Sequence, residues 1–221
     1  AQREKKQAEV QDRLKQALQA TQALAASAND TKLAPLTAQI EKDWQQLATQ
    51  VAAPGAKAED SFRAHTALVA RQLDLLNQVL DTSTLTLDPE ASSYYLMSGT
   101  LDQLPALTES LGQARAVGAG ALTRRDLGNT ERAALLAAVT AARLQNDKAQ
   151  ALLSRAGEAD AAVQRTLASA QKKAADDASR ALQSIQEQLL QPTELSHPPQ
   201  AYFASLTEAI DTQFALIAKG Y

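Results

Sequence analysis

The stretch from Thr82 to Met97 reads TSTLTLDPEASSYYLM, and the rest of the chain is organised around it. Threonines alternate with leucines here, in a chain whose other segments show long, alanine-rich helical patterns. Asp88 then predicts a helix N-cap, and Pro89 the first helical residue, where a missing N–H costs nothing. The stretch therefore predicts the end of one helix and the start of another, with Tyr94 and Tyr95 near the start of the second.

Composition fixes the fold class and excludes several functions. The 221 residues are 45% apolar but only 4% aromatic, with few glycines and prolines, and alanine favours helix strongly. The class is therefore predicted to be all-α. A net charge of −3 without a basic stripe argues against a nucleic-acid partner. No run approaches twenty apolar residues, and the absence of cysteine excludes disulfides and thiolate metal sites.

Hydrophobic spacing of three and four residues divides the chain into helices. Pro105 lies inside the fourth helix and is expected to bend it. The fifth contains only Gly157 as a breaker, so it is predicted to be continuous over roughly 60 residues, or about 90 Å. The predicted helices cover residues 1–28, 35–52, 58–81, 89–122, 130–191 and 199–219.

These lengths predict a long helical bundle, arranged as two four-helix bundles stacked end to end and sharing long helices. One bundle would hold about residues 31–160, and the other about residues 1–30 with 161–221. The alternative is one long up-down-up-down bundle whose second element is broken at residues 82–88. In either arrangement, Thr82–Met97 connects two helices of the same bundle.

The sequence offers little for catalysis. It has two histidines, His65 and His197, and lacks HExxH, GxSxG and glycine-rich phosphate-loop motifs. The long helix contains no Glu-x-x-His pair of the kind that di-iron bundles use. The chain is therefore predicted to be a non-enzyme that needs neither a cofactor nor a metal.

A ligand site is better supported, near the interrupted segment. Arginine presents a fork of donors suited to a carboxylate, and tyrosine combines an apolar wall with a polar tip. The alternative is structural: the tyrosines pack the first turn of a helix, the arginines pair with nearby acids, and Trp44 is a core anchor. The candidate ligand-binding residues are Arg63, His65, Arg71, Tyr94, Tyr95 and Arg115.

The pattern from Asp81 to Met97 resembles the extracytoplasmic helical sensor domains of bacterial methyl-accepting chemotaxis proteins, and of related membrane-bound diguanylate cyclases and histidine kinases. Trp44 ahead of the break and the run Ser61–His65 agree with this resemblance, which covers about residues 40–217. The stacked arrangement is similar to helical bimodular sensors and to nitrate- and nitrite-sensing helical domains.

The resemblance implies a periplasmic sensor domain of an inner-membrane chemotaxis transducer, homodimeric and anchored by flanking transmembrane helices. Residues 31–160 would then be membrane-distal. A small organic anion would bind between helices and cause a helix displacement that passes to the membrane. The alternatives are the sensor domain of a cyclase or kinase, and a protein-interaction bundle without a small ligand. A lipid-surface protein is disfavoured, because the apolar stripes are narrow and alanine-filled.

Overall fold

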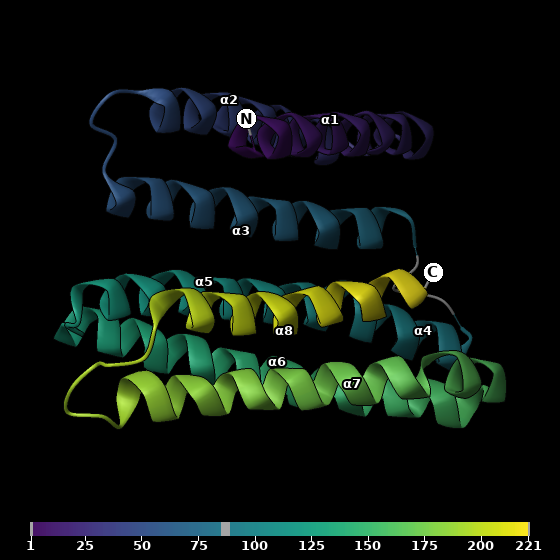
Figure 1. Ribbon diagram of the computed structural model, residues 1–221. Helices are drawn as coiled ribbons and strands as arrows, with labels where there is room; N and C mark the ends of the chain where they lie inside the picture. Colours follow the sequence, from purple (N-terminus) through teal and green to yellow (C-terminus); the bar gives the residue numbers. More distant parts are fainter. Residues whose placement is uncertain (1, 85–88, 221) are drawn as a thin grey trace. The chain divides into compact units, whose positions relative to one another are not determined.

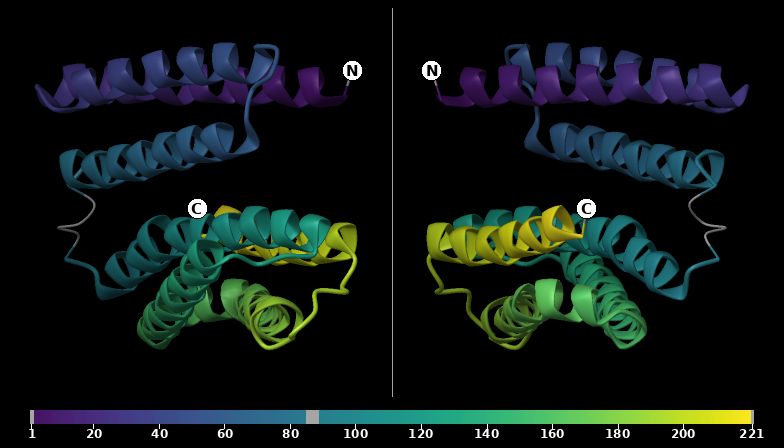
Figure 2. Two further views of the ribbon diagram at one scale, coloured as in Figure 1. Left: turned by 90° about the vertical axis from the view of Figure 1, so that its left-hand side faces the viewer. Right: turned by 90° about the vertical axis from the view of Figure 1, so that its right-hand side faces the viewer.

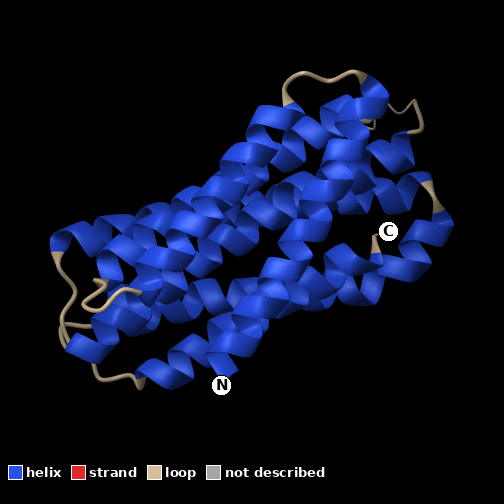
Figure 3. Ribbon diagram, turned by 90° about the horizontal axis from the view of Figure 1, so that it is seen from above, coloured by secondary structure: helices blue, strands red, loops and turns tan. Residues whose placement is uncertain are grey.

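The computed structural model describes residues 2–84 and 89–220, with side chains from residue 5 onward. It confirms the all-α class: within these ranges every regular element is a helix (Figure 3). The chain divides into two compact units, Ala1–Thr86 (unit 1) and Leu87–Tyr221 (unit 2). None of the described helices combines the length and the apolar character that crossing a bilayer requires.

Unit 1 consists of three helices, α1 (Gln2–Ala28), α2 (Leu33–Ala52) and α3 (Ala58–Thr82) (Figure 1). The break predicted at residues 53–55 is present, with Gly55 in the left-handed region at φ 80°. All three helices contribute to the core, which consists of Leu18, Ala25, Leu33, Ile40, Leu47, Leu68 and Leu75.

Hydrogen bonds of the Asp30 side chain link the turn between α1 and α2 to the end of α3. Its carboxylate accepts hydrogen bonds from the backbone N–H groups of Lys32 at 2.6 Å and Leu33 at 3.1 Å, capping α2. It also accepts from the side chains of Thr82 and Gln78 on α3. The hydrogen bond from Thr82 is the largest cause of the lowered pKa of Asp30.

The buried face of α3 differs from the stripe that a spacing of three and four residues predicts for this helix, which consists of Phe62, Thr66, Val69, Leu73, Leu76 and Leu80. Leu68 and Leu75 are buried in the unit 1 core, whereas the predicted Val69 and Leu73 are only half-buried. The reason is that α3 carries apolar side chains around much of its circumference. Its spacing therefore could not determine which side α1 and α2 cover.

Unit 2 is a four-helix bundle whose first side is the run α4 (Ala91–Met97), η2 (Ser98–Gln103) and α5 (Leu104–Arg124). The remaining helices are α6 (Asn129–Ala159), α7 (Ala161–Ile185), continued by η3 (Gln186–Leu190), and α8 (Pro199–Lys219). α5 packs on α6 and α8, and α7 packs on the same two helices, so the four sides close (Figure 2). Helix α4 begins two residues after the predicted start at Pro89, and the predicted cap Asp88 lies outside the described residues.

The predicted bend at Pro105 takes the form of a π-helical segment, η2, directly before it. Pro105 has no N–H and its ring crowds the carbonyl four residues earlier. The wider π turn accommodates this, because the backbone N–H of Leu104 bonds to the Gly99 carbonyl five residues back. The Thr100 hydroxyl donates to the Leu96 carbonyl at 2.7 Å.

The predicted continuous helix over residues 130–191 is wrong. The chain reverses at Asp160, and α6 and α7 pack against each other as a helical hairpin. Asp160 has extended backbone angles and accepts from the Ala162 N–H at 2.7 Å, which caps α7. A Cβ at Gly157 would meet the end of the Gln164 side chain, so glycine leaves room for that side chain beside the reversal. The shared long helix on which the stacked arrangement depended is therefore absent.

The centre of unit 2 is the contact between α5 and α8. Tyr202 is fully buried, and its hydroxyl donates to the Ala114 carbonyl at 2.9 Å. Gly118 allows this approach, since a Cβ there would lie 2.6 Å from Leu189 Cδ1 and closer still to the Tyr202 hydroxyl. At the other end of α8, a Cβ at Gly220 would lie 2.7 Å from Thr100 Cγ2, so the end of α8 lies beside η2.

Candidate functional site

Unit 1 contains a cleft beside the tryptophan of α2, which we call the Trp44 cleft. Its volume is about 290 Å³, near the lower end of the roughly 300–1,000 Å³ typical of small-molecule sites. All three helices of the unit contribute to its lining, which consists of Lys6, Gln7, Val10, Trp44, Leu47, Ala48, Val51 and His65.

The cleft arises because α1 covers α2 and α3 unevenly. In its second half α1 buries Leu18, Thr21 and Ala25. Residues 5–13 are exposed, and Val10 retains 48% of its accessible surface. A narrow apolar stripe thus closes one end of the helix interface and leaves the other end partly open.

The polar lining residues of this otherwise apolar cleft are Lys6, Gln7 and His65, and two of them, Lys6 and His65, can meet a negative charge. His65 donates from Nδ1 to the Ser61 carbonyl oxygen at 2.7 Å, so Nε2 is the ring nitrogen that α3 does not engage. Lys6 contributes an exposed ammonium group. The indole wall of Trp44 with these two groups suits a small molecule that has an apolar body and an anionic end.

Trp44 also lines a second cavity, of about 230 Å³, between α1 and α2. Its lining is more polar than that of the Trp44 cleft and includes Lys15, Glu41 and four glutamines. Trp44 is half-buried between the two cavities. It is therefore not solely the core anchor that the structural interpretation assigned to it.

Of the candidates on α3, His65 alone lines the Trp44 cleft. Arg63 is exposed and pairs with Glu59 at 3.3 Å and Asp60 at 3.1 Å, both on its own helix. Arg71 forms an ion pair with Asp43 that ties α3 to α2. Both arginines thus pair with acids, as the structural alternative expected.

The tyrosine pair lies in unit 2. Tyr94 and Tyr95 make an edge-to-face contact with ring centroids 5.5 Å apart, and the guanidinium of Arg155 lies 5.7 Å from the centroid of Tyr95. Tyr94 keeps 43% of its surface exposed. The pair is therefore a partly exposed aromatic cluster and not a packed first turn.

Arg115 is half-buried between α5 and α8. Its guanidinium lies 4.5 Å from the centroid of Phe203, and one amino group donates to the Thr207 hydroxyl at 2.7 Å. Burial lowers the pKa of Arg115, and the charge of Asp211 opposes that shift. Arg115 follows Tyr94 by 21 residues of consecutive helix, which is about 30 Å.

The six candidates therefore do not form one site within either unit. Unit 1 holds the three on α3, and unit 2 holds the tyrosine pair and Arg115, which lie apart. Sequence reasoning missed Lys6 and Val10 because an exposed stretch of amphipathic helix gives no ligand-specific signal. Among the described residues, no cluster of three or more histidine, aspartate or glutamate side chains is arranged to hold a metal ion.

A family profile described as "Nitrate and nitrite sensing" matches residues 1–216, almost the whole chain. No curated protein and no solved structure matches the chain.

Proposed function

Because the chain belongs to the nitrate and nitrite sensing family of extracytoplasmic helical sensor domains, we propose that it senses a small organic anion bound in the Trp44 cleft. The family is one of sensor domains in signalling proteins and not of catalysts. The proposal adds the ligand class and the site. It also adds a parent protein in the inner membrane, a chemotaxis transducer acting as a homodimer with this domain in the periplasm.

The Trp44 cleft is the observation that carries the proposal. An apolar wall from Trp44, Leu47 and Val51 would bind the body of the ligand, while Lys6 and His65 would meet its carboxylate. A protein-interaction bundle without a small ligand would not need such a cleft. The exposed face of Tyr94 also argues against purely structural packing at the interrupted segment.

The mechanism follows from the position of the cleft at the open end of α1. A ligand that contacts Lys6 and Val10 on α1, Trp44 on α2 and His65 on α3 favours the arrangement in which all three helices reach it. The size of this population shift is set by how much more tightly the ligand binds that arrangement than the alternative arrangements of the helices. The resulting displacement of α1 would be the signal passed to the membrane.

Isothermal titration of the 221-residue chain tests the proposal, with benzoate as an aromatic acid and acetate as a carboxylate lacking an apolar body. Benzoate is expected to bind more tightly than acetate. Lys6→Gln should weaken benzoate binding about two- to fivefold, since an exposed charge contributes under roughly 1 kcal/mol. Lys5→Gln is the matched control, because Lys5 is the adjacent lysine on α1 and does not line the cleft.

His65→Gln should likewise weaken benzoate binding, with His197→Gln as control at the other histidine of the chain. A benzoate affinity that neither Lys6→Gln nor His65→Gln changes would refute the cleft as the site. Absence of heat and of thermal shift with every organic acid would refute direct sensing of this ligand class.

The family description favours a second candidate, sensing of nitrate or nitrite themselves. These ions are small and planar and have no apolar body, so they gain little from the indole wall of Trp44. Titration with sodium nitrate and sodium nitrite, with sodium chloride as the ionic-strength control, separates the two candidates. Nitrate binding that is indifferent to Trp44→Phe would favour the second.

A further inference from the structure

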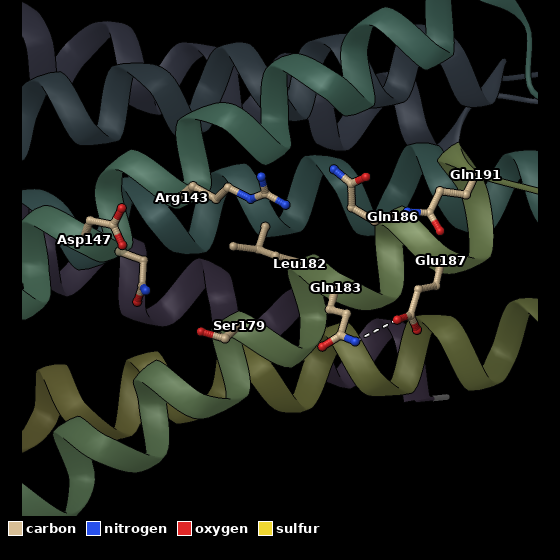
Figure 4. A pocket seen from close by; sticks show the side chains of 9 residues that line it. Arg143, Asp147, Ser179, Leu182, Gln183, Gln186, Glu187 and Gln191 are labelled. Atoms are coloured by element: carbon tan, nitrogen blue, oxygen red, sulfur yellow. Dashed lines mark hydrogen bonds between the residues drawn. The ribbon is translucent and has the colours of Figure 1, made fainter.

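The α6–α7 hairpin lines an open pocket of about 370 Å³, which we call the α6–α7 pocket (Figure 4). Arg143 on α6 and Gln186 on the facing helix extend toward one another across it, and Gln183 and Glu187 line its other side. Its full lining is Arg143, Asn146, Asp147, Ser179, Leu182, Gln183, Gln186, Glu187 and Gln191.

The π-helical segment η3 shapes one wall of this pocket. The backbone N–H of Gln191 donates to the Gln186 carbonyl at 2.9 Å, a bond that spans five residues. In an α-helix these two side chains would point roughly 140° apart, whereas the wider turn brings both to the pocket. Arg132 holds the end of the segment by donating to the Leu190 carbonyl at 2.7 Å. π turns of this kind are frequent at functional sites.

On the opposite wall, the side-chain oxygen of a buried asparagine lacks a partner among the described residues. Asn146 is only 8% exposed, and its Oδ1 accepts no hydrogen bond from the described residues. A buried acceptor left unsatisfied is costly, and each such group calls for an explanation. A hydrogen-bond donor on a bound molecule would satisfy it.

The charges of the pocket are mixed and separated. Arg143 has no ion pair with any described residue, so its guanidinium is available. Glu187 accepts from the Gln183 amide at 2.7 Å, and Asp147 adds a second carboxylate. A simple anion would meet Arg143 but also two carboxylates, and a simple cation would meet the reverse. A molecule with a negative and a positive group can pair the first with Arg143 and the second with the carboxylates.

We propose that the α6–α7 pocket binds a free α-amino acid or a similar small zwitterion. The ligand carboxylate pairs with Arg143 and accepts from the Gln186 amide, while its ammonium group donates to Glu187. The α6–α7 pocket and the Trp44 cleft have no residue in common, so this proposal does not depend on organic-acid sensing in the Trp44 cleft.

Thermal-shift screening of the 221-residue chain with the standard amino acids at millimolar concentration is the first test. The decisive comparison is then between a binding amino acid and its analogues that lack one charge, for example L-alanine against propionate and ethylammonium. The amino acid should bind at least roughly tenfold more tightly than either analogue, because each loses a charge-assisted contact.

Arg143→Gln should weaken amino-acid binding at least roughly tenfold, whereas Arg165→Gln, on the exposed face of α7, should leave it unchanged. Glu187→Gln should weaken amino-acid binding but strengthen propionate binding, since it removes a repelling carboxylate; Glu158→Gln is its control. Helical circular dichroism verifies that each variant is folded. Failure of every amino acid to bind, or binding that Arg143→Gln leaves intact, overturns the proposal.

Discussion

Units 1 and 2 are built from the same alanine-rich helices but bury their cores to different depths. In unit 2 the central side chains, including Leu107, Leu135, Ile185 and Tyr202, are 0% exposed. Among the described residues of unit 1, only Leu33 and Ile40 reach that level, and the other core residues keep 4–8% of their surface. Four sides close around a core, whereas three helices with narrow stripes leave it partly open.

The difference shows how one kind of sequence yields both a rigid and an adaptable region. A fully packed core resists displacement of its helices, since shifting them opens cavities. A less completely covered core lets one helix move at lower cost. The Trp44 cleft lies in the less closely packed unit, at the exposed half of α1, where a ligand would have the greatest effect on helix position.

The largest expected effect is the loss of stability on truncating a core leucine. Leu135→Ala in unit 2 should lower the free energy of unfolding by about 3–5 kcal/mol, and Leu75→Ala in unit 1 by about 2–3 kcal/mol. Urea unfolding resolves the units, because the single tryptophan, Trp44, reports unit 1 and circular dichroism reports both. Equal losses for the two variants would contradict the difference in packing.

A pair of glycines on α5 tests the close approach inside unit 2. Gly118→Ala should destabilise by about 1–3 kcal/mol, because its Cβ would press on Leu189 and Tyr202. Gly112→Ala should stabilise by about 0.5–1 kcal/mol, since nothing lies within 4 Å of a Cβ there and alanine favours helix. Thermal melting with the same sign for both variants would refute the tight α5–α8 contact.

The lowered pKa of Asp177 predicts that the stability of unit 2 depends on pH. Burial raises its pKa, but the hydrogen bonds from Lys173 and Thr212 and the positive charges of Lys173 and Arg180 outweigh that, and the net pKa is below its ordinary value. The stabilisation is therefore present above about pH 4 and lost as pH falls through the lowered folded-state pKa. Asp177→Asn should cost about 1–2 kcal/mol at pH 7 and flatten the acid-side loss.

Urea midpoints at pH 7, 4 and 3 measure this effect, and Asp30 provides the comparison in unit 1. Its pKa is also lowered, so acid should weaken both units of the unaltered chain. Asp177→Asn should alter the transition seen by circular dichroism and leave that of Trp44 fluorescence unchanged, whereas Asp30→Asn should alter both. An Asp177→Asn variant with an undiminished acid-side loss in unit 2 would contradict the assignment.

The smallest effects are expected for the two arginines of α3. Arg71→Ala should cost about 0.5–1 kcal/mol because it removes the ion pair to Asp43 on the neighbouring helix. Arg63→Ala should cost less than about 0.5 kcal/mol, since its acidic partners lie on the same exposed face. Trp44 fluorescence in urea distinguishes them, and a larger loss for Arg63→Ala would reverse the expected order.

The helix ends that carry local signals could be predicted from the sequence. The break at Ala53–Gly55 and the start of α8 at Pro199 agree with the prediction, because proline fixes its own φ and lacks an N–H, and glycine adopts backbone angles that other residues avoid. The reversal at Asp160 was missed. An aspartate within a helical pattern is common, and here the packing of α7 on α6 decides that it acts as a cap.

The candidate sites depended on the same tertiary information. His65 was selected as a polar group beside an apolar stripe, and it does line a cleft. The α6–α7 pocket could not be found, because a continuous helix places Arg143 and Gln183 roughly 60 Å apart. Only the hairpin brings them to one pocket. Ligand sites between helices thus follow from the reversals of the chain more than from its residue patterns.

The four sides of unit 2 alternate in direction, so the chain enters and leaves this unit at one end, where Gly220 lies beside Thr100. A unit whose two ends lie close together tolerates a change in where its chain begins and ends. A short linker could join the end of α8 to the start of α4 and new ends could be opened at the α6–α7 turn, giving a circular permutant with the same core.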